Sequence, residues 1–270
     1  MIKYLDLRTK NYEDRKKRNI NFDFNIYDWN KSPYSCLKAR VYIELSTIFA
    51  FFFQYTSITA NHISLIYCIS GIVAGILLTT NSDALIISGL IIFFLKGSID
   101  WTDGLIARIK NQTSSIGHIL DTWGSHIGTC SLISSLGIYC YNNSNNNIYL
   151  FLTIIILFLK IIDFKLFAYH QLFHELLNDE INFDIKKNEN EVDNSIKKKK
   201  SFTVLLIKNF MDDRARTVDL VCFLIFLEII FQYQNFSKII FGLYLIKTIM
   251  LFIGIIYFYY YKEILEKKIR

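Results

Sequence analysis

The stretch Ser98–His126, SIDWTDGLIARIKNQTSSIGHILDTWGSH, places Asp100, Asp103 and Asp121 at the edges of long apolar runs. Burying a lone carboxylate among apolar groups is costly, because the charge loses its hydration. Asp100 and Asp103 are three residues apart, so on a helix both side chains project from one face, one turn apart. The stretch therefore predicts two apolar helices whose polar ends bring three carboxylates together.

The composition is that of a membrane protein. Of the 270 residues, 52% are hydrophobic and 16% aromatic, and a single proline occurs. These values exclude an ordinary soluble globule and indicate an all-α, integral membrane bundle of six transmembrane helices. The runs with little or no charge are Ile63–Thr80, Ala84–Leu95, Ile127–Tyr141, Ile148–Leu159, Leu220–Phe236 and Ile239–Tyr261. Several are shorter than the roughly 20 residues of a span, so we expect them to extend into their polar flanks.

Lys and Arg residues are concentrated in alternate connections. The segment up to Arg40 holds ten and Gln171–Arg216 holds nine, whereas Asn81–Asp83 and Tyr141–Asn147 hold none. With six spans, every cation-rich segment falls on one side, which the positive-inside rule makes the cytoplasm. We therefore expect a multi-pass protein of a bacterial inner membrane, with both termini and the site in the cytoplasm.

A seventh apolar stretch, Val41–Thr56, competes for a span. If it crossed the membrane, the ten N-terminal cations would lie outside, so we interpret it as an interfacial amphipathic helix. The chain then divides into a cytoplasmic arm with this interfacial helix, residues 1–56, and a six-helix membrane domain, residues 57–270. A charged insert at about 176–203 is expected to be a flexible cytoplasmic loop.

The residues that follow the first two aspartates are suited to a phosphorylated ligand. Gly104 and Ala107 continue the same helical face with almost no side chain, so a polar ligand can approach the backbone. Arg108 is a fork-shaped donor that matches a phosphate or diphosphate. Carboxylates beside this small-residue face supply the oxygen ligands that Mg²⁺ or Mn²⁺ prefers, and substrate phosphates often complete the coordination of such a cation.

This pattern resembles the signature of the CDP-alcohol phosphatidyltransferase family, D-x2-D-G-x2-A-R-x8-G-x3-D-x3-D. The sequence has Asp at 100, 103 and 121, with Gly104, Ala107, Arg108 and Gly117 at the signature spacing, so seven of the eight defined positions match. Weaker support lies upstream, where Ala60-Asn61-x-x-Ser64 is similar to the family's Pro-Asn-x-x-Thr.

The resemblance implies a homodimeric membrane enzyme that transfers a phosphoalcohol group from a CDP-alcohol to an acceptor hydroxyl and releases CMP. The three aspartates would bind Mg²⁺ or Mn²⁺. The substrate-binding residues would be Gly104, Ala107, Arg108, Ser114 and Gly117. Outside the signature, Arg214 and Arg216 are candidates for holding an anionic acceptor, although they equally fit a juxtamembrane anchor.

The eighth signature position is Ser125, where the family has an aspartate that is the presumed general base. A serine hydroxyl is too weak a base to replace it. His126 has a suitable pKa but points about 100 degrees further around a helix. Three alternatives remain: His126 is the base, the metal site lacks one ligand, or the protein has lost activity.

Two other functions are alternatives to this enzyme. A catalytically silent homologue would act as a binding or dimer partner. A small ion-coupled transporter would use the carboxylates as ion ligands, but the sequence shows neither inverted repeats nor broken spans. A position at the membrane surface is a simpler explanation of the basic, aromatic N-terminal arm than binding of nucleic acid, so no nucleic-acid partner is expected.

Overall fold

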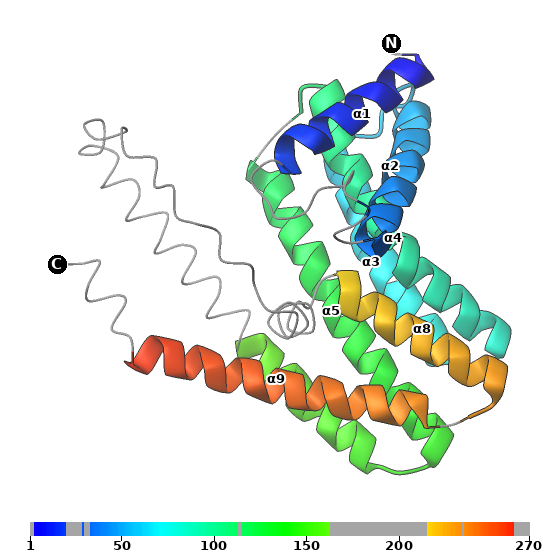
Figure 1. Ribbon diagram of the computed structural model, residues 1–270, viewed down its shortest axis with the longest axis vertical. Coiled ribbons are helices and arrows are strands. Elements are labelled where there is room, and N and C mark those ends of the chain that lie inside the picture. The colour runs from blue at the N-terminus through cyan, green and yellow to red at the C-terminus, as the bar shows by residue number, and fades with distance from the viewer. Residues whose placement is uncertain are drawn as a thin grey trace.

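The computed structural model describes residues 3–19, 29, 33–112, 115–162, 215–233 and 235–261. Within these ranges all regular structure is helical, which confirms the all-α class (Figure 1). The helices are α1 (Tyr4–Asn19), α2 (Pro33–Phe53), α3 (Ala60–Leu78), α4 (Asp83–Ile109), α5 (Ser115–Ser144), an unlabelled helix Ile148–Ile162, α8 (Ala215–Phe231) and α9 (Phe236–Tyr261). The insert expected at about 176–203 lies outside the described residues.

Six of these helices coincide with the six predicted spans. In the described part of the chain, Ala60–Leu78, Asp83–Ile109 and Phe236–Gly254 are long and apolar enough to cross a membrane. The helix Ile148–Ile162 is apolar but shorter as far as it is described, and α8 has 17 residues. The structure therefore supports an integral membrane protein, whereas the six-span count stays a prediction.

Helix α2 begins earlier than the interfacial helix predicted over Val41–Thr56. It starts at Pro33, since proline suits a first helical position where no N–H partner is needed, and it ends at Phe53. Asn11 of α1 fastens α1 to α2, because its amide nitrogen lies 3.1 Å from Ser46 Oγ and 3.0 Å from Thr47 Oγ1. The placement of α2 at the membrane surface stays a prediction.

Helices α3, α4 and α5 form the centre of the bundle, with α1 and α2 at one end and α9 crossing α5 towards the other (Figure 1). The spacing of Gly71 and Gly75 on α3 and of Gly124 and Gly128 on α5 predicts close helix packing. The structure confirms it: a Cβ at Gly71 would lie 3.2 Å from the Gly128 Cα. The hydroxyl of Ser131 crosses the same interface and donates to the Gly71 carbonyl over 2.8 Å.

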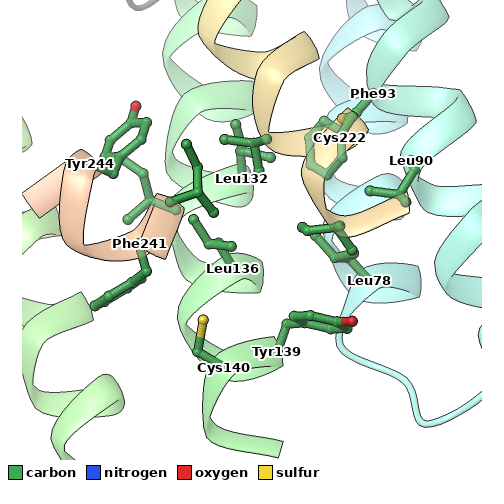
Figure 2. Close-up of a cluster of buried hydrophobic side chains, with 14 of the residues drawn as sticks. Leu78, Leu90, Phe93, Leu132, Leu136, Tyr139, Cys140, Cys222, Phe241 and Tyr244 are labelled. Carbon is green, nitrogen blue, oxygen red and sulfur yellow. The ribbon is translucent and has the colours of Figure 1, made fainter. Parts of the chain in front are cut away.

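The apolar core fills the half of the bundle that is remote from α1. Figure 2 shows Leu78, Phe93, Leu136 and Phe241 meeting there from α3, α4, α5 and α9. A smaller cluster at the opposite end joins α1 and α2 to the bundle and comprises Leu7, Ala50, Ala60, Ile63, Leu105 and Ile106. The polar residues of the candidate site lie on α3, α4 and α5 between these two clusters.

Candidate functional site

Three carboxylates meet where α4 approaches α5. Asp100 and Asp103 lie one turn apart on α4, and Asp121 lies in the first half of α5. The carboxyl groups of Asp100 and Asp121 are in hydrogen-bonding contact, and Asp103 interacts electrostatically with both. All three residues are half-buried. The structure thus brings together the three residues that the sequence proposes as metal ligands.

Helix α3 supplies two further polar groups to this cluster. Ser64 donates its hydroxyl to Asp103 Oδ2 over 2.6 Å and so fixes one carboxylate. Tyr67 lies one turn further along and interacts electrostatically with all three aspartates. A capping box sets the start of α3: Thr59 accepts from the His62 N–H, and its own N–H lies 3.2 Å from His62 Nδ1.

Two cations lie beside the carboxylates. Lys96 is four residues before Asp100 on α4, is buried, and interacts electrostatically with that carboxylate. Its Nζ lies 4.4 Å from the centroid of the Tyr67 ring. Arg15 comes from α1 and interacts electrostatically with Asp100 and Asp103. Both positive charges lower the cost of gathering three carboxylates at this depth.

Arg108 lies at the end of α4, two turns beyond Asp100. Its Nε donates to Asp14 Oδ2 of α1 over 3.1 Å. Gly104 leaves room for the guanidinium: of the described atoms, a Cβ there would meet only Arg108 Nη1, at 3.4 Å. Ala107 instead packs against the cluster that joins α1, α2 and α3, so its small size serves helix packing.

The candidates for the base follow Asp121 on α5. Ser125 is one turn beyond it, on the same face, and His126 is the next residue; both are half-buried. The Ser125 carbonyl accepts from the Thr129 hydroxyl over 3.0 Å. Gly117 lies one turn before Asp121 and is half-buried. Ser114, Arg214 and the side chain of Arg216 lie outside the described residues.

The donor set suits a hard divalent cation, although its side chains are not arranged as a formed metal site. Among the described residues, no group of three His, Cys, Asp or Glu side chains has the arrangement needed to hold a metal ion. The carboxyl groups of Asp100 and Asp121 nevertheless lie close enough to interact, and a bound divalent cation would offset the repulsion between them. Carboxylate oxygens are the ligands that Mg²⁺ and Mn²⁺ prefer.

Asp219 of α8 also has a defined place. Its Oδ2 accepts hydrogen bonds from the Lys38 amine and the Tyr34 hydroxyl, both of α2. Burial lowers the pKa of Lys38, and the adjacent carboxylate opposes that shift. Asp219, which lies close to the candidate acceptor-binding arginines in the sequence, therefore serves to join α8 to α2.

Sequence reasoning missed Asp14 and Arg15. Both lie in a run of mixed charges, Glu13 to Arg18, that is typical of an exposed helix. Nothing in their spacing relates them to the signature some 90 residues later, so only the docking of α1 reveals their proximity to the site.

Comparison with protein families gives one match. The family described as CDP-alcohol phosphatidyltransferase matches residues 57–180, a region that includes α3, α4, α5 and the helix Ile148–Ile162. Helices α1 and α2 lie outside the match. No curated protein matches the chain significantly.

Proposed function

We propose, starting from the match of residues 57–180 to the CDP-alcohol phosphatidyltransferase family, that this protein is a membrane phosphotransferase. It moves a phosphoalcohol group from a CDP-alcohol to an acceptor hydroxyl and releases CMP. The observation that carries the proposal is the meeting of Asp100, Asp103 and Asp121 close to α1 and Arg108. This arrangement combines ligands for a cation with a guanidinium that can donate hydrogen bonds to a phosphate.

The reaction exchanges one P–O bond for another. The acceptor oxygen bonds to the phosphorus that carries the alcohol, the bond from that phosphorus to the bridging oxygen breaks, and CMP leaves with the bridging oxygen. Arg108 would bind the diphosphate and oppose the negative charge that develops on it. The acceptor's proton must pass to a base, for which His126 is the nearest candidate on α5 in sequence.

The three aspartates would hold the divalent cation, Mg²⁺ or Mn²⁺. When bound, such a cation screens the charge of the diphosphate and of the departing CMP. Ser64 would then keep Asp103 oriented through its 2.6 Å hydrogen bond. Lys96 would hold Asp100 through its charge, without itself contacting the substrate.

A second function is favoured by one specific observation, which is Ser125 at the signature's eighth position. A chain that lacks the general base could still bind a CDP-alcohol and act as a silent partner of an active enzyme. Binding without turnover would identify this case. The proposal also includes six spans with cytoplasmic termini, which agree with the distribution of Lys and Arg. A homodimer, as the resemblance to the family implies, completes it.

The test is CMP release by the purified full-length protein in lipid nanodiscs, with CDP-diacylglycerol and soluble CDP-alcohols as donors and a panel of hydroxyl acceptors. Asp100→Asn and Asp121→Asn should abolish release, because each removes a ligand charge but keeps the side-chain shape. Asp83→Asn is the matched control, since Asp83 is exposed at the opposite end of α4. Equal turnover in all three variants would refute the proposed site.

A further inference from the structure

Helix α1 is firmly docked although it lies outside the region that matches the family. Arg8 Nε lies 2.9 and 2.8 Å from the two carboxylate oxygens of Glu44 on α2, and the Tyr12 hydroxyl donates to the same carboxylate over 2.8 Å. Leu7 is fully buried in the cluster shared with α2, α3 and α4. The C-terminal half of α1 is thereby held in a fixed position relative to the site.

Two adjacent residues of α1 reach the site from this position. Asp14 bonds to Arg108, as described above, and Arg15 stacks on Trp101, with its Cζ 3.9 Å from the ring centroid. Trp101 follows Asp100 directly and is held by Tyr42 of α2, at 5.5 Å between ring centroids and nearly perpendicular. Stacking fixes the plane of the Arg15 guanidinium next to Asp100 and Asp103.

The chemistry of these contacts suits a diphosphate. A guanidinium stacked on an aromatic ring holds its N–H groups in its own plane, parallel to the ring, so they point outwards and can donate to phosphate oxygens. Arg108 is held through Nε, so Asp14 sets the direction of its remaining N–H groups. A diphosphate carries negative charge on two neighbouring phosphorus atoms, and two oriented guanidiniums match that distribution better than one.

We propose that α1 is part of the substrate site, with Arg15 as a second guanidinium that binds the donor's diphosphate and Asp14 as a positioning residue that orients Arg108. This inference rests on the proposed function and deepens it. It assigns part of donor recognition to a helix outside residues 57–180. Arg15 would also relieve repulsion between the diphosphate and the two aspartates of α4.

The experiment measures binding of radiolabelled CDP to the full-length protein by equilibrium dialysis with Mg²⁺ present, together with KM and kcat for CMP release. Arg15→Gln should weaken CDP binding about tenfold or more, the effect of one lost charge-assisted hydrogen bond. It should raise KM for the donor more than it lowers kcat. Arg15→Lys should recover part of the affinity, because the charge returns without the planar fork.

Lys10→Gln is the matched control. It removes one cation from an exposed position of the same helix and should leave CDP binding unchanged. Asp14→Asn keeps an acceptor for Arg108 but removes its charge, so it should weaken CDP binding less than Arg15→Gln does. Thermal unfolding of each variant shows whether α1 remains docked.

Each outcome decides the inference. Wild-type CDP affinity in Arg15→Gln would overturn it, and loss of CMP release in Asp100→Asn would show that the proposed reaction nevertheless holds. If Arg15→Gln lowers both the CDP affinity and the unfolding temperature, and Arg15→Lys restores neither, then Arg15 has only a structural role. If the wild type binds CDP but releases no CMP, the proposed reaction fails and the CDP affinity of Arg15→Gln alone decides. Absence of CDP binding by the wild type would overturn both.

Discussion

Replacing Gly128 by alanine moves Lys96 without changing any charged residue. Gly128 is buried on α5, and the atom nearest to a Cβ built there is Lys96 Nζ, which is too close to stay in place. The end of a lysine side chain is flexible, so it can move aside while the helices keep their positions. The substitution therefore tests whether the location of this amine matters to Asp100.

The expected effects on stability nearly cancel. Alanine in place of a helical glycine stabilises by about 1 kcal/mol. Moving the amine from its place 4.4 Å from the Tyr67 ring centroid loses a cation–π contact worth about 0.5–2 kcal/mol. We therefore expect the unfolding temperature of Gly128→Ala to lie close to that of the wild type.

Activity should change more. For unit charges at an effective dielectric constant of about 20, increasing a separation from about 5 Å to about 8 Å removes about 1.2 kcal/mol of attraction. If this support for Asp100 is needed in the transition state, CMP release should fall about tenfold.

Thermal unfolding and CMP release are measured in parallel, with Gly242→Ala as the control. Among the described residues, a Cβ at Gly242 of α9 meets no atom within 4 Å, so we expect this variant to gain helix propensity alone. Unchanged CMP release in Gly128→Ala would refute the role assigned to Lys96. A large drop in its unfolding temperature would refute the claim that only the amine moves.

Three further predictions concern the base, the docking of α1 and the topology. If position 125 has lost its base, Ser125→Asp should raise CMP release by up to about 10²- to 10⁴-fold; if His126 serves instead, His126→Ala should collapse the rate and Ser125→Asp should not help. A native activity that neither substitution alters would exclude both residues as the base. The hydrogen bond from Arg8 lowers the pKa of Glu44 from its ordinary 4.5, so its stabilising effect is complete above pH 4.5 and is lost as the pH falls through the lowered value. The unfolding temperature of Glu44→Gln should therefore not show the loss that this ion pair causes at acidic pH. The same dependence of unfolding temperature on pH in variant and wild type would contradict the prediction. In a variant without native cysteines, Leu5→Cys should resist an impermeant maleimide applied to intact cells, whereas labelling from outside would contradict cytoplasmic termini.

The sequence predicted those features that depend on helical periodicity. Asp100 and Asp103 face the same way because three residues make nearly one turn, and α4 continues unbroken from Asp83 through both of them. Close packing at Gly71 and at Gly128 was predictable for the same reason, since glycines four residues apart form a groove on one helical face, whereas the pairing of these two glycines was not.

Contacts between distant segments could not be predicted in this way. Asp14 and Arg108 are 94 residues apart, and their ion pair arises because Leu7 and Asn11 dock α1 on the bundle. No local propensity encodes that docking. The start of α2 was missed for a different reason: hydropathy located its apolar half, whereas the polar first turns from Pro33 carry no apolar signal.

Charge balance links the docked arm to the carboxylates. Three aspartates meet two basic side chains that the described residues bring within electrostatic range, Lys96 on α4 and Arg15 on α1, so the acidic groups outnumber the basic ones by one. Lys96 is buried on α4 and lies over the Tyr67 ring, so its amine stays beside the carboxylates whether or not α1 is docked. Arg15 reaches the same carboxylates only while α1 is docked. On the proposed function, a diphosphate that enters adds further negative charge, so we expect its binding to need both the arm and an additional cation, and losing either should weaken the same step.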